Sequence, residues 1–233
     1  NQFDLGAWTN NRDLGKSTFR VNIAEGSRGL TLKTIKTTLN GTVDTFNFKG
    51  YNYKNIVMNG TFDEQVFDGK LGVDDPNIDF TFVGTINLQD TMPDFDFKAD
   101  IRRLDLGALN LVPEDWVLSG KVEKLGLRFS NLSDLTGVVR LRDFRILQDR
   151  QFVHRIDTLL FTSAPLPHGL RSYNLKSDVA SFYMEGRFDA AKVVGNLGKL
   201  FAQNYPGLAA QLGIVAAPDS VKLTDQFTLQ GVV

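Results

Sequence analysis

The chain has 233 residues, of which 42% are hydrophobic, and a formal net charge of −1 at pH 7. This balance excludes a strongly basic nucleic-acid binder and an acidic disordered tail, and the length allows one large unit or two small domains. The sequence contains no cysteine, which excludes disulfides, thiolate zinc sites and cysteine nucleophiles.

Phenylalanine dominates the aromatic residues, with 18 Phe against 2 Trp and 5 Tyr. Phe supplies apolar area without a polar group, so it suits a surface that stays dry. No run of about 18 apolar residues occurs, so no segment is predicted to span a bilayer as a helix. The chain starts at Asn1 without a signal peptide and ends in a strand-like pattern at Val233, and we expect it to be a segment of a longer protein.

Short alternating runs predict strands in the first part of the chain. In the first of them Phe19, Val21 and Ile23 alternate with polar residues. The predicted strands here span residues 18–24, 30–38 and 41–49.

The clearest pattern covers residues 55–106, where four alternating runs are separated by turn-forming residues. A period of two predicts strands with one dry and one wet side. The third run illustrates it: Phe80, Phe82 and Ile86 share one parity, while Asp79 and Thr81 have the other. The block therefore predicts an antiparallel sheet with a Phe-rich side and a polar side.

The alternation changes phase within residues 116–130. Val122 belongs to one phase, and Leu125 and Leu127 belong to the other. A β-bulge near Lys124 explains the change. The later predicted strands span residues 135–146, 152–163, 172–180 and 181–188.

A short pattern of Gly, any residue and then Val, Ile or Phe recurs within the predicted strands. Interior strand glycines mark a bend or a close approach, so their repetition would let a long sheet curl. The glycines concerned are Gly41, Gly60, Gly84, Gly120, Gly137, Gly186 and Gly231.

One segment is predicted to be helical. Asp189 is a suitable N-cap, and Val193, Leu197 and Leu200 follow at helical spacing until Pro206 stops the pattern. The expected organisation is therefore a continuous antiparallel β unit over residues 1–188, a helical insertion of one or two short helices over 189–213, and a further strand over 214–233.

The sequence offers little for catalysis. His154 and His168 have no carboxylate or second histidine at metal-ligand spacing, and Asp74 and Asp75 precede a Pro-Asn turn. No calcium loop and no Gly-rich phosphate loop are present. We expect no enzyme activity, no cofactor and no metal.

The alternating apolar residues leave two architectures open. A two-sheet sandwich would bury the Phe side chains under a second layer of strands. A long sheet curled into an open trough would show the same alternation, with acyl chains filling its inner face. Periodicity does not separate these two.

An ordered succession of motifs covers most of the chain: Tyr53 to Phe62, Asp79 to Leu88, Pro93 to Ile101, Asp105 to Leu111, Leu175 to Asp178, Met184 to Phe188, and Asn204-Tyr205-Pro206. This succession resembles the TamB family, the translocation and assembly module subunit, and its AsmA-like relatives, in the form common in Bacteroidota.

The resemblance implies a mainly β fold, with a long antiparallel sheet curled into an open hydrophobic groove (a β-taco). It also implies a periplasmic location, with the full-length protein anchored in the inner membrane through a segment not present here. The implied function is phospholipid passage between the inner and outer membranes. The implied partners are phospholipid acyl chains and an outer-membrane barrel of the TamA/BamA type, without nucleic acid.

The apolar parity supplies the expected lipid-lining residues. They are Ile56, Met58, Phe62, Phe80, Phe82, Ile86, Phe95, Phe97, Ile101, Leu127, Phe129 and Phe161. Two alternatives remain: a scaffold or chaperone whose exposed strand edges assist outer-membrane β-barrel assembly, and a closed sandwich with a binding role.

Overall fold

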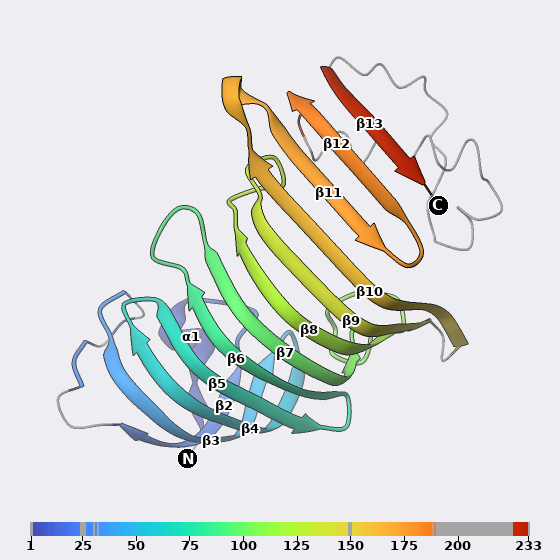
Figure 1. Cartoon of the computed structure of the whole chain (residues 1–233). Helices are drawn as coiled ribbons and strands as arrows, with labels where there is room; N and C mark the ends of the chain where they lie inside the picture. The colour runs from blue at the N-terminus through green and yellow to red at the C-terminus, as the bar shows by residue number, and fades with distance from the viewer. Residues whose placement is uncertain are drawn as a thin grey trace.

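The computed structural model describes residues 2–23, 27–29, 31, 33–148, 151–187, 189 and 226–232. These residues form one antiparallel sheet in which the strands follow one another in chain order (Figure 1). Twelve strands, β2 to β13, make the continuous sheet, and the two-residue strand β1 adds to its first edge. The mainly β prediction is confirmed, and the described strands contain no second layer.

The first half of the sheet comprises β1 (Phe3–Asp4), β2 (Lys16–Ile23), β3 (Lys36–Phe48), β4 (Tyr51–Asp63), β5 (Val66–Asp75) and β6 (Ile78–Asn87). The second half comprises β7 (Asp94–Asp105), β8 (Trp116–Arg128), β9 (Thr136–Gln148), β10 (Gln151–Pro165), β11 (Arg171–Ser177), β12 (Ser181–Arg187) and β13 (Gln226–Val232). The described helices are short: α1 (Leu5–Thr9) and the 3-10 helix η1 (Pro167–Gly169). The predicted helical insertion over 189–213 lies outside the described residues, except for Asp189.

The four strands predicted within residues 55–106 are confirmed as β4 to β7. The strand predicted over 41–49 is confirmed as part of β3. The separate strand predicted over 30–38 is wrong, because β3 begins at Lys36 and runs through Asn40 and Gly41 without a break. Both residues pair on either side, Asn40 with Asn22 and Asn59, and Gly41 with Val21 and Met58. Ladders on both edges hold this Asn-Gly pair extended, although its composition favours a turn.

Tight turns connect the strands and fix their register. Between β3 and β4, Lys49 and Gly50 have φ values of 48° and 78°. Between β4 and β5, Glu64 and Gln65 have φ values of 47° and 75°. Two successive positive φ angles are typical of the type I′ turn, whose twist matches that of the flanking strands.

The sheet is open and twisted, and its two ends lie far apart (Figure 1). It is not strongly curled, so the expectation that the repeated strand glycines would curl the sheet is wrong. The glycines do lie inside strands, and two of them, Gly60 and Gly84, gather in one place because Gly69 on β5 faces both. Their effect is a local close approach of β4, β5 and β6.

The Gly60 position shows how close this approach is. A Cβ atom there would lie 2.7 Å from the Gly69 Cα and closer still to the Asp68 carbonyl oxygen. Gly72, on the neighbouring strand β5, is different, because its Cβ would meet only the Thr81 methyl at 3.9 Å.

We predict that Gly60→Ala lowers the free energy of unfolding by about 1–3 kcal/mol, because the added methyl forces two backbones apart. Gly72→Ala is the matched control and should be neutral or slightly stabilising. Urea denaturation of both variants measures the difference. Equal effects at the two positions would contradict the close approach.

In the turn after β11, the side chain of Asp178 continues the hydrogen bonding between β11 and β10. The Asp178 carboxylate accepts hydrogen bonds from the backbone N–H groups of Asp157 (3.0 Å) and Thr158 (3.1 Å) on β10. These bonds, the one from Asp157 first, lower the pKa of Asp178 below its ordinary value of 3.8. Since the folded-state pKa is depressed, the stabilisation is present above the unfolded-state pKa and disappears as the pH falls through the folded-state value.

Asp178→Asn should therefore lower the thermal midpoint at pH 7, and the difference from the wild type should shrink as the pH falls below about 4. Thermal scans monitored by circular dichroism between neutral and acidic pH measure this. Asp94→Asn removes the same charge from an exposed position of β7 and serves as the control. A difference for Asp178→Asn that stayed constant with pH would rule out a role for its ionised form.

Candidate functional site

One face of the sheet carries a continuous apolar row that runs across the strands. Each strand from β4 to β10 contributes one residue, and neighbours in the row are directly opposed in the ladder. The row is Met58, Leu71, Phe82, Ala99, Val122, Leu141 and Leu159. At about 4.8 Å between strands, these seven strands span about 29 Å.

A second apolar row runs parallel to the first on the same face. The row of Gly60, Gly69, Gly84 and Phe97 lies between the two, and aromatic contacts connect them. The second apolar row consists of Phe62, Phe67, Ile86, Phe95 and Leu127 on β4 to β8. The Phe82 ring centroid lies 4.8 Å from that of Phe97 and 6.1 Å from that of Phe67. Offset and tilted rings at such separations attract one another in addition to the area that they bury.

Bulges keep the apolar residues on this face where the strands bend. The bulge predicted near Lys124 is confirmed by a register shift between Val122 and Lys124. At the corresponding points of other strands a pair of consecutive polar residues replaces the usual single one. The pairs are Lys54-Asn55, Arg102-Arg103, Glu123-Lys124 and Arg142-Asp143.

The left-handed backbone of Asn55 (φ 52°) and of Asp143 (φ 51°) marks two of these points. Asn and Asp tolerate this conformation better than most residues. The phase change lets Tyr53 join Ile56 in the buried cluster, since both are at most 8% exposed. On β9, the polar pair Arg142-Asp143 with its left-handed Asp143 likewise restores the alternation, so that Phe144 is in phase again.

An open depression of about 580 Å³ lies on this face over β6, β7 and β8. All its lining residues are apolar: Ile78, Phe80, Phe82, Ile86, Phe95, Phe97, Ala99, Ile101, Leu104, Val122, Leu125, Leu127 and Phe129. Most of them are half-buried, and Ile78, Phe82 and Val122 are buried. Such a surface can hold a hydrocarbon chain but offers no group that would hydrogen-bond to a polar ligand.

The structure brings eight of the twelve predicted lining residues together in this depression. They are Phe80, Phe82, Ile86, Phe95, Phe97, Ile101, Leu127 and Phe129. Of the other four, Ile56 is buried in a neighbouring cluster with Met58 packed against it. Phe62 is half-buried opposite Phe67, and Phe161 belongs to a separate cluster around Tyr173. Whether any of them contacts lipid stays a prediction.

Five lining residues were missing from the prediction: Ile78, Ala99, Leu104, Val122 and Leu125. Ile78 and Ala99 share the parity of the predicted strands, so the alternation alone indicated them. Leu125 follows the predicted bulge near Lys124 and shares the phase of Leu127, so the alternation indicated it as well. Leu104 follows the polar pair Arg102-Arg103, and counting that pair as a bulge would have placed it on the apolar face.

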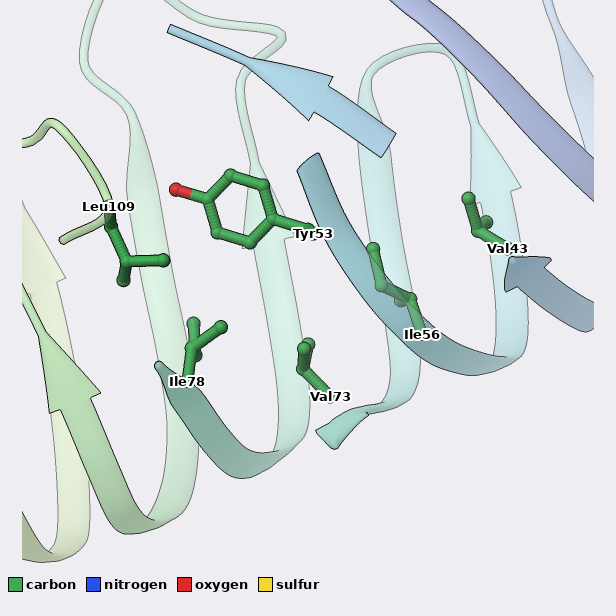
Figure 2. Packing of buried hydrophobic residues seen from close by; sticks show 6 residues of the cluster. All are labelled: Val43, Tyr53, Ile56, Val73, Ile78 and Leu109. Carbon is green, nitrogen blue, oxygen red and sulfur yellow. The ribbon is translucent and has the colours of Figure 1, made fainter. Parts of the chain in front are cut away.

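The apolar face is covered at the β3–β5 end by the connection between β7 and β8. Leu109 from this connection is fully buried and packs in a cluster with Val43, Tyr53, Ile56, Val73 and Ile78. Figure 2 shows the Leu109 side chain turned toward Ile78 and Tyr53. The cluster therefore closes the part of the face that adjoins the open depression.

A buried carboxylate borders this cluster. Asp75 is 4% exposed and accepts hydrogen bonds from the Tyr51 hydroxyl, the Asn77 backbone N–H at 3.0 Å and the Lys54 backbone N–H at 3.2 Å. Burial, and then the hydrogen bond to Asp75, raises the pKa of Tyr51 to about 12. The Asp75 carboxylate therefore has a structural role, because it joins the ends of β4 and β5. The turn predicted after Asp75 lies at the same place.

The connection between β8 and β9 covers the other side of the face. The Tyr173 hydroxyl donates to the Leu132 carbonyl at 2.6 Å, and the Ser163 hydroxyl donates to the Leu135 carbonyl at 2.5 Å. Tyr173 and Met184 are buried there, with Leu135 and Phe161 packed against them. The depression thus lies between two covered regions.

The remaining polar residues form no recognisable reaction centre in the described part of the chain. His168 is an exposed residue of η1, and the side chain of His154 lies outside the described residues. The described residues contain no group of three His, Cys, Asp or Glu side chains that could hold a metal ion.

No family model, curated protein or solved structure matches the chain. Among the described residues, no helix has the length and apolar character needed to cross a membrane. The apolar face itself is therefore the observation on which a function can be built.

The openness of this face is testable through two phenylalanines that touch each other. Phe82→Ala should lower the free energy of unfolding by about 3–5 kcal/mol, because Phe82 is 6% exposed. Phe97→Ala should cost about half as much, since Phe97 is only half-buried and already faces solvent in part. Denaturant titrations compare them, and equally large losses would mean that a further layer covers Phe97.

Proposed function

We propose that this chain is a segment of a long β-groove protein that conducts phospholipid between the inner and outer membranes. The observation that supports the proposal is the apolar row across β4 to β10, together with the wholly apolar depression over β6 to β8. The resemblance of the chain's motifs to the TamB family points the same way.

In this proposal, acyl chains lie on the apolar face and move across the strands. Burying apolar area is favourable by about 25 cal/mol per Å², and this term depends little on the exact position of the chain. A face without hydrogen-bonding groups holds no head group in one place. Lipid can therefore slide from strand to strand, while head groups stay in water at the edges of the face.

The sheet would serve as a shallow groove. Its two covered regions, under Leu109 and around Tyr173, form raised borders on either side of the depression. We propose that further segments of the full-length protein extend this surface in the periplasm, from an inner-membrane anchor toward an outer-membrane barrel of the TamA/BamA type. The location and these partners follow from the family resemblance.

A scaffold for outer-membrane β-barrel assembly is the second candidate. It is favoured by the position of β13 as the last strand in the sheet order, which leaves one of its edges without a described strand partner. Unpaired edges can add strands from other proteins. Crosslinks from β13 to nascent barrel proteins, without lipid bound to the purified chain, would support this role.

Placing a charge on the apolar path should stop lipid binding. Phe80→Glu and Phe97→Glu should each reduce the phospholipid that co-purifies with the chain by at least about ten-fold, because a carboxylate would be desolvated under the acyl chains. Mass spectrometry of lipids extracted from equal amounts of folded protein measures the effect.

Val83→Glu is the matched control on the same strand. Val83 is 53% exposed on the opposite face and is paired with Lys70 and Lys98, so a carboxylate fits there. This variant should keep the wild-type lipid content. Unchanged lipid in Phe80→Glu and Phe97→Glu, with circular dichroism showing a folded sheet, would refute conduction along this face.

A further inference from the structure

The connection between β7 and β8 differs from the two-residue connections β3–β4 and β5–β6 at the same end of the strands. Residues 106–115 fold back onto the apolar face instead of making a tight turn. Their Leu109 has 0% exposure and is the largest fully buried side chain among the described residues. A loop residue therefore occupies one of the best-buried positions on a face otherwise formed by strands.

The open depression and the site under Leu109 are continuous. Ile78, Phe80 and Leu104 line the depression, and the same three residues belong to the cluster that contains Leu109. The cross-strand row of Val43, Ile56, Val73, Phe80 and Ile101 connects the two areas. Leu109 thus lies where a hydrocarbon chain in the depression would continue toward β3.

Few polar contacts hold the loop in this position. Its own turn is local, with the Leu109 N–H donating to the Asp105 carbonyl at 3.0 Å and the Ala108 N–H to the Asp105 carboxylate at 3.1 Å. The Asn110 side-chain amide makes the contact to the far side of the face, donating to the Lys49 carbonyl at 3.0 Å. The local turn can move as a unit once that contact is broken.

We propose that the loop over residues 106–115 is a plug that covers a second acyl-binding subsite on β3 to β5. When the plug lifts, Val43, Tyr53, Ile56 and Val73 become the floor of an extension of the depression, and an acyl chain replaces Leu109. The inference rests on the proposed function and adds to it the regulation of how much of the face is open.

The exchange is balanced because hydrocarbon replaces hydrocarbon. The acyl chain recovers the apolar contacts that Leu109 gives up, so the principal loss on opening is the Asn110 hydrogen bond. A ligand that binds only the open state has its apparent affinity reduced by the fraction of molecules that are open. Weakening the plug should therefore strengthen binding of long acyl chains.

Asn110→Ala tests this by removing the contact to Lys49. The probe is cis-parinaric acid, whose fluorescence rises in apolar sites, with laurate and stearate as competitors. The variant should bind the probe about five-fold more tightly than the wild type, the factor expected for one lost hydrogen bond. Stearate should gain more than laurate, because only the longer chain reaches the second subsite.

Asn52→Ala is the control. It removes the side-chain hydrogen bond between Asn47 and Asn52 in the same hairpin at 2.8 Å without touching the loop. Its affinity for the probe and its preference between laurate and stearate should match the wild type. A gain in Asn52→Ala equal to that in Asn110→Ala would show a general loosening of the hairpin and overturn the plug.

A reducible bridge provides the opposite test in a chain that has no cysteine of its own. A Cβ on Gly50 would lie 3.7 Å from the end of the Asn110 side chain, so a short bifunctional thiosulfonate can bridge Gly50→Cys and Asn110→Cys through two disulfides. Gly50 has a φ of 78°, so Gly50→Cys strains the turn, and the unbridged double variant is therefore the reference. The bridged form should lose the stearate preference, and reduction should restore it within the same protein. If the pair does not crosslink, the Asn110→Ala comparison decides alone.

The outcomes separate the two proposals. Binding by the wild type with no change in either loop variant overturns the plug and leaves the conduit standing. No binding by the wild type or by any loop variant overturns both. Binding that appears only after the loop is loosened supports the plug, and shows that the depression alone is too small to hold the probe.

Discussion

The structure depends on the phase of the apolar–polar alternation in each strand. The apolar side chains of many consecutive strands must all point to the same face of the sheet. A slip of one residue would move a strand's whole apolar set to the polar face. On β7 and β8 the register shifts coincide with two consecutive polar residues, Arg102-Arg103 and Glu123-Lys124. The inserted residue takes up the bend, and the next apolar residue returns to the face.

This constraint explains how a single layer of strands can keep an apolar face partly open. Aromatic and aliphatic side chains of neighbouring strands cover one another, so most residues of the depression are half-buried without a second sheet above them. Two connections, carrying Leu109 and Leu135, cover the regions on either side. The exposed remainder is a bounded area that suits a mobile hydrocarbon guest, and large uncovered apolar areas commonly mark binding surfaces.

The proposed plug and the proposed conduit would use the same physical property of this face. Apolar contacts are non-directional, so a leucine from the chain itself and an acyl chain from a lipid can exchange on one surface with little difference in free energy. In both proposals, specificity would come from the few polar contacts at the edges, such as that between Asn110 and Lys49. Regulation by such a contact would leave the surface itself free of groups that bind a head group.

The strands of residues 55–106 and their apolar parity follow from the sequence, because a period of two and frequent turn residues are local signals. The bulge near Lys124 was predictable for the same reason. The continuity of β3 through Asn40-Gly41 was not, since pairing on both edges overrides local turn preference. Nor did the sequence show that Gly60, Gly69 and Gly84 would face one another, or that Leu109 would cover Ile56. The glycine contacts depend on the register between strands. The position of Leu109 depends on the loop folding back to the hairpin, where Asn110 contacts Lys49, 61 positions earlier. Only the tertiary structure decides these two features.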